Sequence, residues 1–379
     1  MFNRAIQYTF LIFLCLVISP LQAYAQDTTA KQAIIIDFDT GNILFEHNAD
    51  ERMPTSSMSK VMTMYLVFEA LKRGDINLDD EFVVSEKAWK KQGSKMFVPV
   101  GKKVKVEDLI RGVIVQSGND ATIVLAEGLA GSEEAFAQAL NEKAKELGMN
   151  NSHFMNASGW PDPDHYSTAR DLATLAMAMI KNFPDYYKYY AEKEFTYHDI
   201  TQQNRNPLLY RDIGADGIKT GHTEDGGYGL IGSGEKDGRR VVMVLNGMES
   251  NKHRKEESVR LLQWALNSFK NITLFKNQKP IEKAKVTMGA SLNVPLIPAD
   301  NLILTVPSLY QKKLDVSLEY NSPLVAPLSK GQEVGTVKII TPAGEEKTMS
   351  LLVAEDVEEL NFFLKFLVKA RMLAQQRGG

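Results

Sequence analysis

Ile34-Ile35-Ile36-Asp37-Phe38 is an apolar run typical of a strand, and Asp39-Thr40-Gly41-Asn42 follows it with turn residues. Ile43 to Glu46 then predicts a return strand, so the whole stretch predicts a β-hairpin. A second hairpin is predicted far along the chain, where Tyr228–Ser233 and Arg239–Leu245 flank a turn at residues 235–238. Because helical segments separate the two hairpins, the pattern indicates an α+β domain whose two ends share one sheet.

The segments between the two hairpins, and the segment after the second hairpin, contain many helix signals. Residues 57–73 contain no Gly or Pro, and Gly74 follows them as a stop. Ser132 precedes another helical stretch as an N-cap, and Gly148 closes it. The expected helices cover residues 57–73, 121–129, 133–147, 169–180 and 255–269, and the last is expected to bury Val259, Leu262, Trp264, Leu266 and Phe269.

The residue pattern of the sequence changes after about Phe275. Short Val- and Leu-rich runs alternate there with Pro, Gly and Asn, which predicts a small all-β domain. The expected strands cover residues 291–297, 302–306, 314–319 and 336–341. We therefore divide the chain into a leader (1–25), an α+β domain (26–275), a β-rich domain (276–356) and a terminal helix (357–379).

Composition excludes several classes of protein. The chain has 379 residues, of which 44% are hydrophobic and 24% charged, and its formal net charge is −3. This apolar fraction is too high for a disordered chain. The charge balance leaves no basic surplus for a nucleic-acid partner. The single cysteine excludes a disulfide framework and a cysteine-based zinc site.

The first 25 residues predict an export signal. Arg4 is their only charge, Phe10 to Ile18 is an apolar run, and Ala23-Tyr24-Ala25 forms a small-x-small cleavage site. An uncleaved N-terminal anchor is the alternative. Cys15 lies inside the apolar run and would leave with the signal, so the mature chain would contain no thiol, as suits an oxidising compartment.

Ser57-Met58-Ser59-Lys60 is the first of three short motifs that carry chemistry. On a helix, Ser57 and Lys60 would share one face and lie within side-chain reach. A serine hydroxyl is a weak nucleophile until a base takes its proton. A lysine can be that base only if burial or a nearby cation lowers its pKa.

Two further motifs complete the set. In Ser117-Gly118-Asn119, the glycine allows a tight turn that can direct both polar side chains into a cleft. In Lys219-Thr220-Gly221, at the end of a predicted strand, the first two residues can bind a carboxylate, and Gly221 lets a ligand backbone approach. Each motif alone is a weak signal. Together they match the type of set found in active-site-serine penicillin-binding enzymes and β-lactamases.

The chain resembles the low-molecular-mass penicillin-binding proteins, which are D-alanyl-D-alanine carboxypeptidases of peptidase family S11. The resemblance covers nearly the whole mature chain, including the β-rich domain. It implies a transpeptidase-like domain with an antiparallel sheet flanked by helices. Besides the motif residues, it rests on residues 93–97, 116–121, 204–206 and 216–223.

The resemblance implies a role for each motif residue. Ser57 would attack the terminal D-Ala-D-Ala peptide bond and form an acyl-enzyme, with Lys60 as general base. Ser117 and Asn119 would complete the proton network. The segment before the nucleophile departs from the Pro-Ala that is frequent in the family, because Ser56 stands there; only Ser57 has a lysine three residues later.

The third motif would bind the substrate. Lys219 and Thr220 would hold the terminal carboxylate with help from Arg254, and Gly221 would let the peptide approach. The backbone N–H groups of Ser57 and His222 would form the oxyanion hole. No metal or cofactor is expected, since His153, His165 and His198 are too scattered for a metal site.

The terminal helix is expected to bind a membrane surface. From Leu360, an apolar arc containing three phenylalanines in five residues lies opposite a narrow strip with Lys365 and Lys369. Such a helix can lie in the interface between water and lipid; docking on the β-rich domain is the alternative. The expected location is peripheral, on the periplasmic face of the cytoplasmic membrane.

The expected function is removal of the terminal D-alanine from peptidoglycan pentapeptides, with β-lactams as covalent inhibitors. A D,D-endopeptidase acting on cross-linked wall and a β-lactamase are the enzymatic alternatives. No obvious carboxylate motif for deacylating β-lactams is found, which counts against the second. A catalytically silent wall-binding protein is the alternative from another class.

Overall fold

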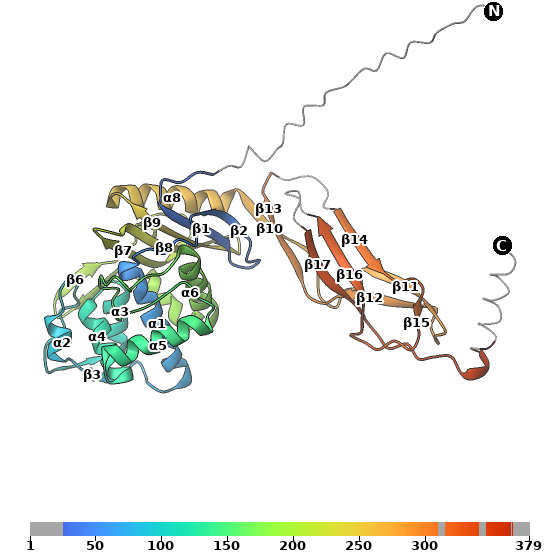
Figure 1. Ribbon diagram of the computed structural model, residues 1–379, viewed down its shortest axis with the longest axis horizontal. Helices are drawn as coiled ribbons and strands as arrows, with labels where there is room; N and C mark the ends of the chain where they lie inside the picture. Colours follow the sequence, from blue (N-terminus) through green and yellow to red (C-terminus); the bar gives the residue numbers. More distant parts are fainter. Residues whose placement is uncertain (1–25, 310–314, 341–345, 365, 367–379) are drawn as a thin grey trace, which may run out of the picture.

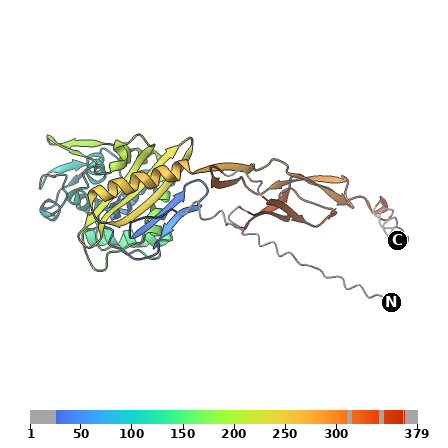
Figure 2. The same cartoon turned by 90° about the horizontal axis from the view of Figure 1, so that it is seen from above.

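The computed structural model describes residues 26–309, 315–340, 346–364 and 366. The leader (1–25) and most of the terminal segment therefore lie outside the described residues. Two domains follow each other along the long axis of the molecule, with helices confined almost entirely to the first (Figure 1, Figure 2). The α+β class and the β-rich second domain predicted from the sequence are confirmed.

The first domain is built on a five-stranded antiparallel sheet. Its strand order is β2-β1-β9-β8-β7, so the N-terminal hairpin pairs with the later one, as predicted. The motif strand β7 lies at the edge opposite β2. The strands are β1 (Gln32–Asp37), β2 (Ile43–His47), β7 (Ala215–Thr223), β8 (Gly227–Lys236) and β9 (Arg239–Met248).

Each face of this sheet packs on a different set of helices. Ile34 and Ile36 point to the main helical cluster, whereas Ile35 points to the core beneath α8. Figure 1 shows α8 on one face of the sheet and the other long helices on the opposite face. The sheet is thus buried on both sides. The helices are α1 (Lys60–Arg73), α2 (Glu86–Lys90), α3 (Val106–Ile114), α4 (Asn119–Ala130), α5 (Glu133–Glu146), α6 (Ala169–Asn182), α7 (Pro184–Tyr187) and α8 (Asn251–Asn267).

Short elements connect these helices and frame the site. They are the 3₁₀ turns η2 (Ser56–Ser59), η3 (Lys188–Ala191) and η4 (Pro207–Tyr210), the antiparallel pair of β3 (Glu81–Val83) and β4 (Lys103–Lys105), and the hairpin of β5 (Glu194–Tyr197) and β6 (Ile200–Gln203). The helix expected from residue 57 is therefore split: its first turn is 3₁₀, and α1 begins at Lys60.

Helix α8 differs from its prediction in start and in buried face. Ser250 caps it by accepting a hydrogen bond from the backbone N–H of His253. Leu262 and Leu266 are buried as expected, but Val259 and Trp264 are only half-buried and Phe269 lies in the next strand. Leu261 and Ala265 are buried although the sequence did not predict it. The face of α8 that meets the sheet is shifted by one residue from the predicted face.

The second domain contains two sheets. One has the order β14-β16-β17-β12-β11-β15, and the other pairs β10 with β13. Its own apolar core lies between them. The strands are β10 (Phe269–Phe275), β11 (Glu282–Thr287), β12 (Asn293–Pro298), β13 (Leu302–Pro307), β14 (Asp315–Tyr320), β15 (Leu324–Val325), β16 (Glu333–Ile340) and β17 (Glu346–Val353).

Both limits of the second domain differ from the sequence division. Strand β10 precedes residue 276 but pairs with β13, so the β-rich domain begins at Phe269. At the other end, Val357 is 3% exposed and exchanges backbone hydrogen bonds with Leu328. Leu360 still donates its backbone N–H to Met288. The β-rich domain therefore continues to Leu360.

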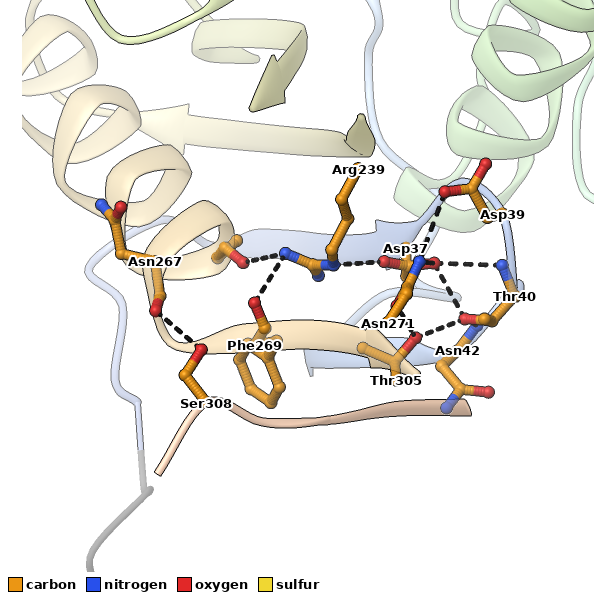
Figure 3. A network of polar contacts seen from close by, with 11 residues as sticks. Asp37, Asp39, Thr40, Asn42, Arg239, Asn267, Phe269, Asn271, Thr305 and Ser308 are labelled. Carbon is orange, nitrogen blue, oxygen red and sulfur yellow. Dashed lines mark hydrogen bonds and ion pairs between the residues drawn. The ribbon is translucent and has the colours of Figure 1, made fainter. Parts of the chain in front are cut away.

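A polar network joins the two domains (Figure 3). Asp37, 0% exposed, accepts hydrogen bonds from Arg239 Nε at 2.7 Å and from Asn271 Nδ2 at 3.1 Å. Thr305 Oγ1 lies 2.8 Å from Asn271 Oδ1 and 2.6 Å from Thr40 Oγ1. The turn of the first hairpin is thereby tied to β10 and β13.

The described part of the terminal segment begins a helix at Phe362. Asn361 Oδ1 accepts a hydrogen bond of 3.0 Å from the backbone N–H of Leu364 and caps its start. Phe362 is 88% exposed and Phe366 65% exposed, so these rings do not dock on the β-rich domain. Among the described helices, none combines the length and the apolar character needed to cross a membrane.

Candidate active site

The start of α1 brings Ser57 and Lys60 together. The 3₁₀ turn η2 places Ser57 one turn before Lys60, and Lys60 Nζ donates a hydrogen bond of 2.9 Å to Ser57 Oγ. The lysine is 0% exposed. Its other partners are Asn119 Oδ1 at 2.7 Å and the Ser158 backbone oxygen at 2.6 Å. Lys60 is thus held by three acceptors and pointed at the serine.

The electrostatic environment disfavours the charged form of Lys60. Burial lowers the pKa of Lys60 to about 7, and the nearby cations of Arg205 and Lys91 act in the same direction. Its three acceptors are neutral groups, so no directly bonded carboxylate restores the charge. At neutral pH a large fraction of Lys60 is therefore the free amine, which can accept a proton.

The second motif lies at the junction of α3 and α4. Ser117 adopts a φ of 59° and is 2% exposed, whereas Asn119 is the first residue of α4. Besides accepting from Lys60, Asn119 donates from Nδ2 to the Gln92 backbone oxygen at 2.8 Å. The contact between Asn119 and Lys60 was predicted from the sequence. The structure adds a second contact, between Asn119 and the loop after α2.

The neighbouring Asp120 holds that loop in place. Its buried carboxylate accepts hydrogen bonds from the backbone N–H groups of Met96 and Phe97, each at 2.8 Å. The backbone N–H of Asn119 donates to the Ser94 oxygen at 2.8 Å. Charge-assisted bonds to a buried carboxylate are strong, so the loop forms a fixed wall of the site.

The third motif lies on the edge strand β7, directly beside η2. Lys219 and Thr220 are 4% and 5% exposed. Gly221 packs so closely on η2 that a Cβ there would lie 2.7 Å from Ser56 Oγ and 2.8 Å from the Thr55 oxygen. Only glycine fits this approach, which brings the strand beside the nucleophile.

Lys219 lies in a site that favours an anion. Burial lowers the pKa of Lys219 well below its ordinary value, and Lys60, Arg205 and Arg254 reinforce the effect. Lys219 Nζ bonds to the Thr220 backbone oxygen at 3.1 Å, and no carboxylate of the described residues forms an ion pair with it. A substrate carboxylate would provide the missing counter-charge.

The two remaining predicted residues are Arg254, which bonds to β7, and His222, which belongs to it. Arg254 of α8 is buried and donates to the Gly221 oxygen at 3.3 Å and to Asn251 Oδ1 at 2.6 Å. Burial lowers its pKa to about 10. The His222 ring is exposed and stacks on Tyr228 with 3.9 Å between ring centroids. The His222 ring therefore lies at the surface, consistent with a role for its backbone.

Sequence reasoning missed Arg205 and Ser158 as parts of the site. Arg205 Nη1 donates to Ser94 Oγ at 2.6 Å, and its charge lowers the pKa of both Lys60 and Lys219. Arg205 lies in residues 204–206, one of the segments on which the family resemblance rests, and this segment could have indicated that Arg205 belongs to the site. Ser158 acts through its backbone oxygen, and residue type gives no signal for such a contact.

The histidines considered for metal binding do not gather. His165 is buried and its Nε2 lies 2.8 Å from Ser59 Oγ, behind the nucleophile. His153 bonds to the Asp164 backbone oxygen, and the His198 ring meets the Tyr197 ring edge to face. Within the described part of the chain, no group of three potential metal ligands is found.

Comparison with known proteins agrees with this geometry. Residues 19–250 match the model of the D-alanyl-D-alanine carboxypeptidase family, and residues 269–359 match that of the penicillin-binding protein 5 C-terminal domain. The D-alanyl-D-alanine carboxypeptidases DacC and DacA of Escherichia coli (strain K12) are 38% and 37% identical to the chain. Each alignment covers 89% of this chain, and 87% and 86% of the relatives.

Solved structures give the same result. Penicillin-binding protein 5 from Haemophilus influenzae matches with a TM-score of 0.80 and 37% identity, over 88% of this chain and 99% of that one. Penicillin-binding protein D2 from Listeria monocytogenes, solved in an ampicillin-bound form, matches over 63% of this chain and 98% of that one, with a TM-score of 0.58 and 29% identity. The chain belongs to the D-alanyl-D-alanine carboxypeptidase family, the serine-type carboxypeptidases among the low-molecular-mass penicillin-binding proteins.

Proposed function

We propose that Ser57 is the nucleophile of this carboxypeptidase and that Lys60 is its general base. The observation that carries the proposal is the 2.9 Å contact between Lys60 Nζ and Ser57 Oγ, at a lysine whose pKa burial lowers to about 7. Lys60 takes the proton of Ser57 as Oγ attacks the carbonyl carbon of the penultimate D-alanine.

The tetrahedral intermediate requires donors for its oxyanion. The backbone N–H groups of Ser57 and His222 supply them, because Gly221 holds β7 directly against η2. Collapse of the intermediate breaks the peptide bond, and the leaving D-alanine nitrogen receives the proton from Lys60 through Ser117. Water then attacks the acyl-enzyme and restores Ser57, with Asn119 holding Lys60 in position.

The terminal carboxylate of the substrate is bound by Lys219 and Thr220, with Arg254 behind the strand. The open edge of β7 suits an extended peptide, which can pair with it as an added strand. The preferred substrate is the peptidoglycan pentapeptide ending in D-Ala-D-Ala, and β-lactams acylate Ser57 in its place. The rival activity, D,D-endopeptidase cleavage of cross-links, uses the same residues.

We further propose that the chain is exported and held on the periplasmic face of the cytoplasmic membrane. The leader (1–25) provides the export signal. Exposed Phe362, Phe363 and Phe366 form the start of an apolar face that needs a partner. An interfacial helix after Leu360 would bury that face among lipid headgroups.

The test of the catalytic assignment combines labelling and turnover. Fluorescent penicillin should label the mature protein, and mass spectrometry should place the adduct on Ser57 and not on Ser56. The Ser57→Ala variant should lose both labelling and D-alanine release from a pentapeptide. Ser329→Ala, in the β-rich domain, should retain both. An adduct on another serine, or D-alanine release by the Ser57→Ala variant, would overturn the assignment.

A further inference from the structure

His165 lies behind the turn that carries the nucleophile, and the proposed catalytic steps do not involve it. The residue is 5% exposed, and its Nε2 lies 2.8 Å from Ser59 Oγ. Ser59 Oγ lies in turn 2.5 Å from Thr55 Oγ1. Thr55 and Ser59 stand two residues before and two residues after Ser57. A chain of three side chains therefore closes the turn beneath the nucleophile.

The turn around Ser57 depends on contacts of this kind. Thr55 is the N-cap residue of η2, but its hydroxyl bonds to Ser59 instead of capping the turn. Ser56 adopts a left-handed φ of 43°, which costs free energy in a residue that has a Cβ. Strained backbone persists only where the surrounding contacts fix it. The bond between Thr55 and Ser59 is such a contact, because it spans the strained residue.

Hydrogen bonding fixes where the His165 proton lies. The backbone N–H of Met155 donates to Nδ1 at 3.2 Å, so Nδ1 is an acceptor and carries no proton. A neutral imidazole has one N–H, which then lies on Nε2 and donates to Ser59 Oγ. Burial lowers the pKa of His165 to about 4, so the ring is neutral at neutral pH. The proton of Ser59 is left to bond to Thr55.

The other side of the imidazole is anchored to the helical core. Phe154 is 1% exposed, and its ring meets the His165 ring edge to face, with 5.6 Å between the centroids. Asn141 of α5 accepts a hydrogen bond from the Phe154 N–H and donates one to the Phe154 oxygen, both at 2.8 Å. His165 therefore connects η2 to a segment that α5 holds in place.

We propose that His165 is a positioning residue for acylation, which holds the turn of Ser57 so that its Oγ stays aligned with Lys60. The hold is exerted through the hydroxyls of Ser59 and Thr55. Because His165 acts from behind the turn, its loss should slow the acylation step more than it weakens noncovalent binding. The inference rests on the proposed function, since it takes Ser57 as the nucleophile.

The experiment follows acylation by a fluorescent penicillin in stopped flow, which separates the dissociation constant of the noncovalent complex from the acylation rate constant. The His165→Leu variant keeps an apolar side chain of similar bulk but loses both hydrogen bonds. Its acylation rate constant should fall about tenfold while the dissociation constant stays unchanged, because a misplaced nucleophile attacks slowly. The His165→Gln variant keeps one acceptor and one donor, and should stay within about threefold of the wild type.

A second set of variants tests the link itself. Ser59→Ala should slow acylation to a similar extent, and adding His165→Leu to it should cause little further loss, because both changes break the same link. His153→Leu is the matched control. His153 bonds to the Asp164 backbone oxygen within the same loop, whereas His165 reaches η2, so the control should acylate at the wild-type rate.

Urea unfolding checks that each variant is folded. If His165→Leu does not fold, Ser59→Ala tests the same link, and wild-type acylation by that variant would overturn the inference. Acylation by His165→Gln as slow as by His165→Leu would also overturn it, as would independent effects of the two changes in the double variant. Failure of penicillin to label Ser57 in the wild type would instead overturn the proposed function.

Discussion

Asn119 Oδ1 lies 2.7 Å from Lys60 Nζ and joins the first turn of α4 to the first turn of α1. The same amide donates to the Gln92 backbone oxygen, so one side chain connects the base to the loop that walls the site. Because an amide oxygen carries no full charge, it holds the lysine while favouring its protonated form less than a carboxylate would. The position and the proton affinity of the base are therefore set by the same contacts.

The rate of acylation should depend on pH through Lys60. Its pKa is lowered to about 7, and only the neutral amine can take the Ser57 proton. The second-order rate constant for acylation by penicillin should rise about tenfold per pH unit below that value and level off above it. Stopped-flow measurement between pH 5 and pH 9 checks this, and a rate that stays constant over that range would contradict the role of Lys60.

Arg205 should tune that pH dependence. Its cation lowers the pKa of Lys60, so the Arg205→Gln variant should shift the rising limb of the acylation profile to higher pH. The Arg205→Lys variant keeps the charge and should stay closer to the wild type. A change in the rate plateau without a shift of the limb would show that Arg205 acts only through its hydrogen bond to Ser94.

Removal of the Asp120 carboxylate should destabilise the domain. The Asp120→Ala variant leaves the N–H groups of Met96 and Phe97 without acceptors, at a cost of about 3 kcal/mol in the free energy of unfolding. Urea unfolding measures this cost. Asp79→Asn breaks an exposed ion pair with Lys105 and should cost less than about 1 kcal/mol. Similar costs for both variants would contradict the role of Asp120 in the loop.

Two glycines with a left-handed backbone should respond differently to alanine. Gly159 (φ +74°) packs on the Ser56 oxygen, and Gly131 (φ +78°) faces open space. Gly131→Ala should cost about 1 kcal/mol of stability and leave acylation intact. Gly159→Ala should displace the turn before Ser57 and reduce acylation at least tenfold. Acylation at the wild-type rate in the Gly159→Ala variant would show that this packing does not position the nucleophile.

Truncation after Leu360 should release the protein from membranes. Residues up to Leu360 belong to the β-rich domain, since Val357 is part of its core. The variant lacking residues 361–379 should therefore fold, hydrolyse a soluble pentapeptide at the wild-type rate and appear in the soluble fraction. Full membrane retention of this variant would refute the proposed anchor, and the Phe362→Ser/Phe363→Ser variant should show an intermediate loss of binding.

The hairpin at residues 34–46 and the alternation of apolar side chains were enough to predict the sheet that the two ends of the first domain share, because strand pairing follows from a period of two residues. The motif spacing also brought Ser57, Lys60 and Asn119 into one site. Local sequence patterns did not predict the features that depend on contacts between distant parts of the chain. Ser158 contributes a backbone atom, and β10 appears continuous with α8 in sequence although it pairs with β13.

The junction around Asp37 has a mechanical consequence. Asn271 donates to Asp37, and Thr40 Oγ1 lies 2.6 Å from Thr305 Oγ1, so these contacts tie the two domains beside β10 (Figure 3). Only Ser268 separates the start of β10 from the end of α8. Hydrogen bonds across the junction resist a change in the angle between the domains, so we expect the β-rich domain to act as a stiff strut and not as a tether. If the far end of the strut rests on the membrane, the catalytic serine works at one height above the lipid, and the layer of wall within its range is set by the length of the strut.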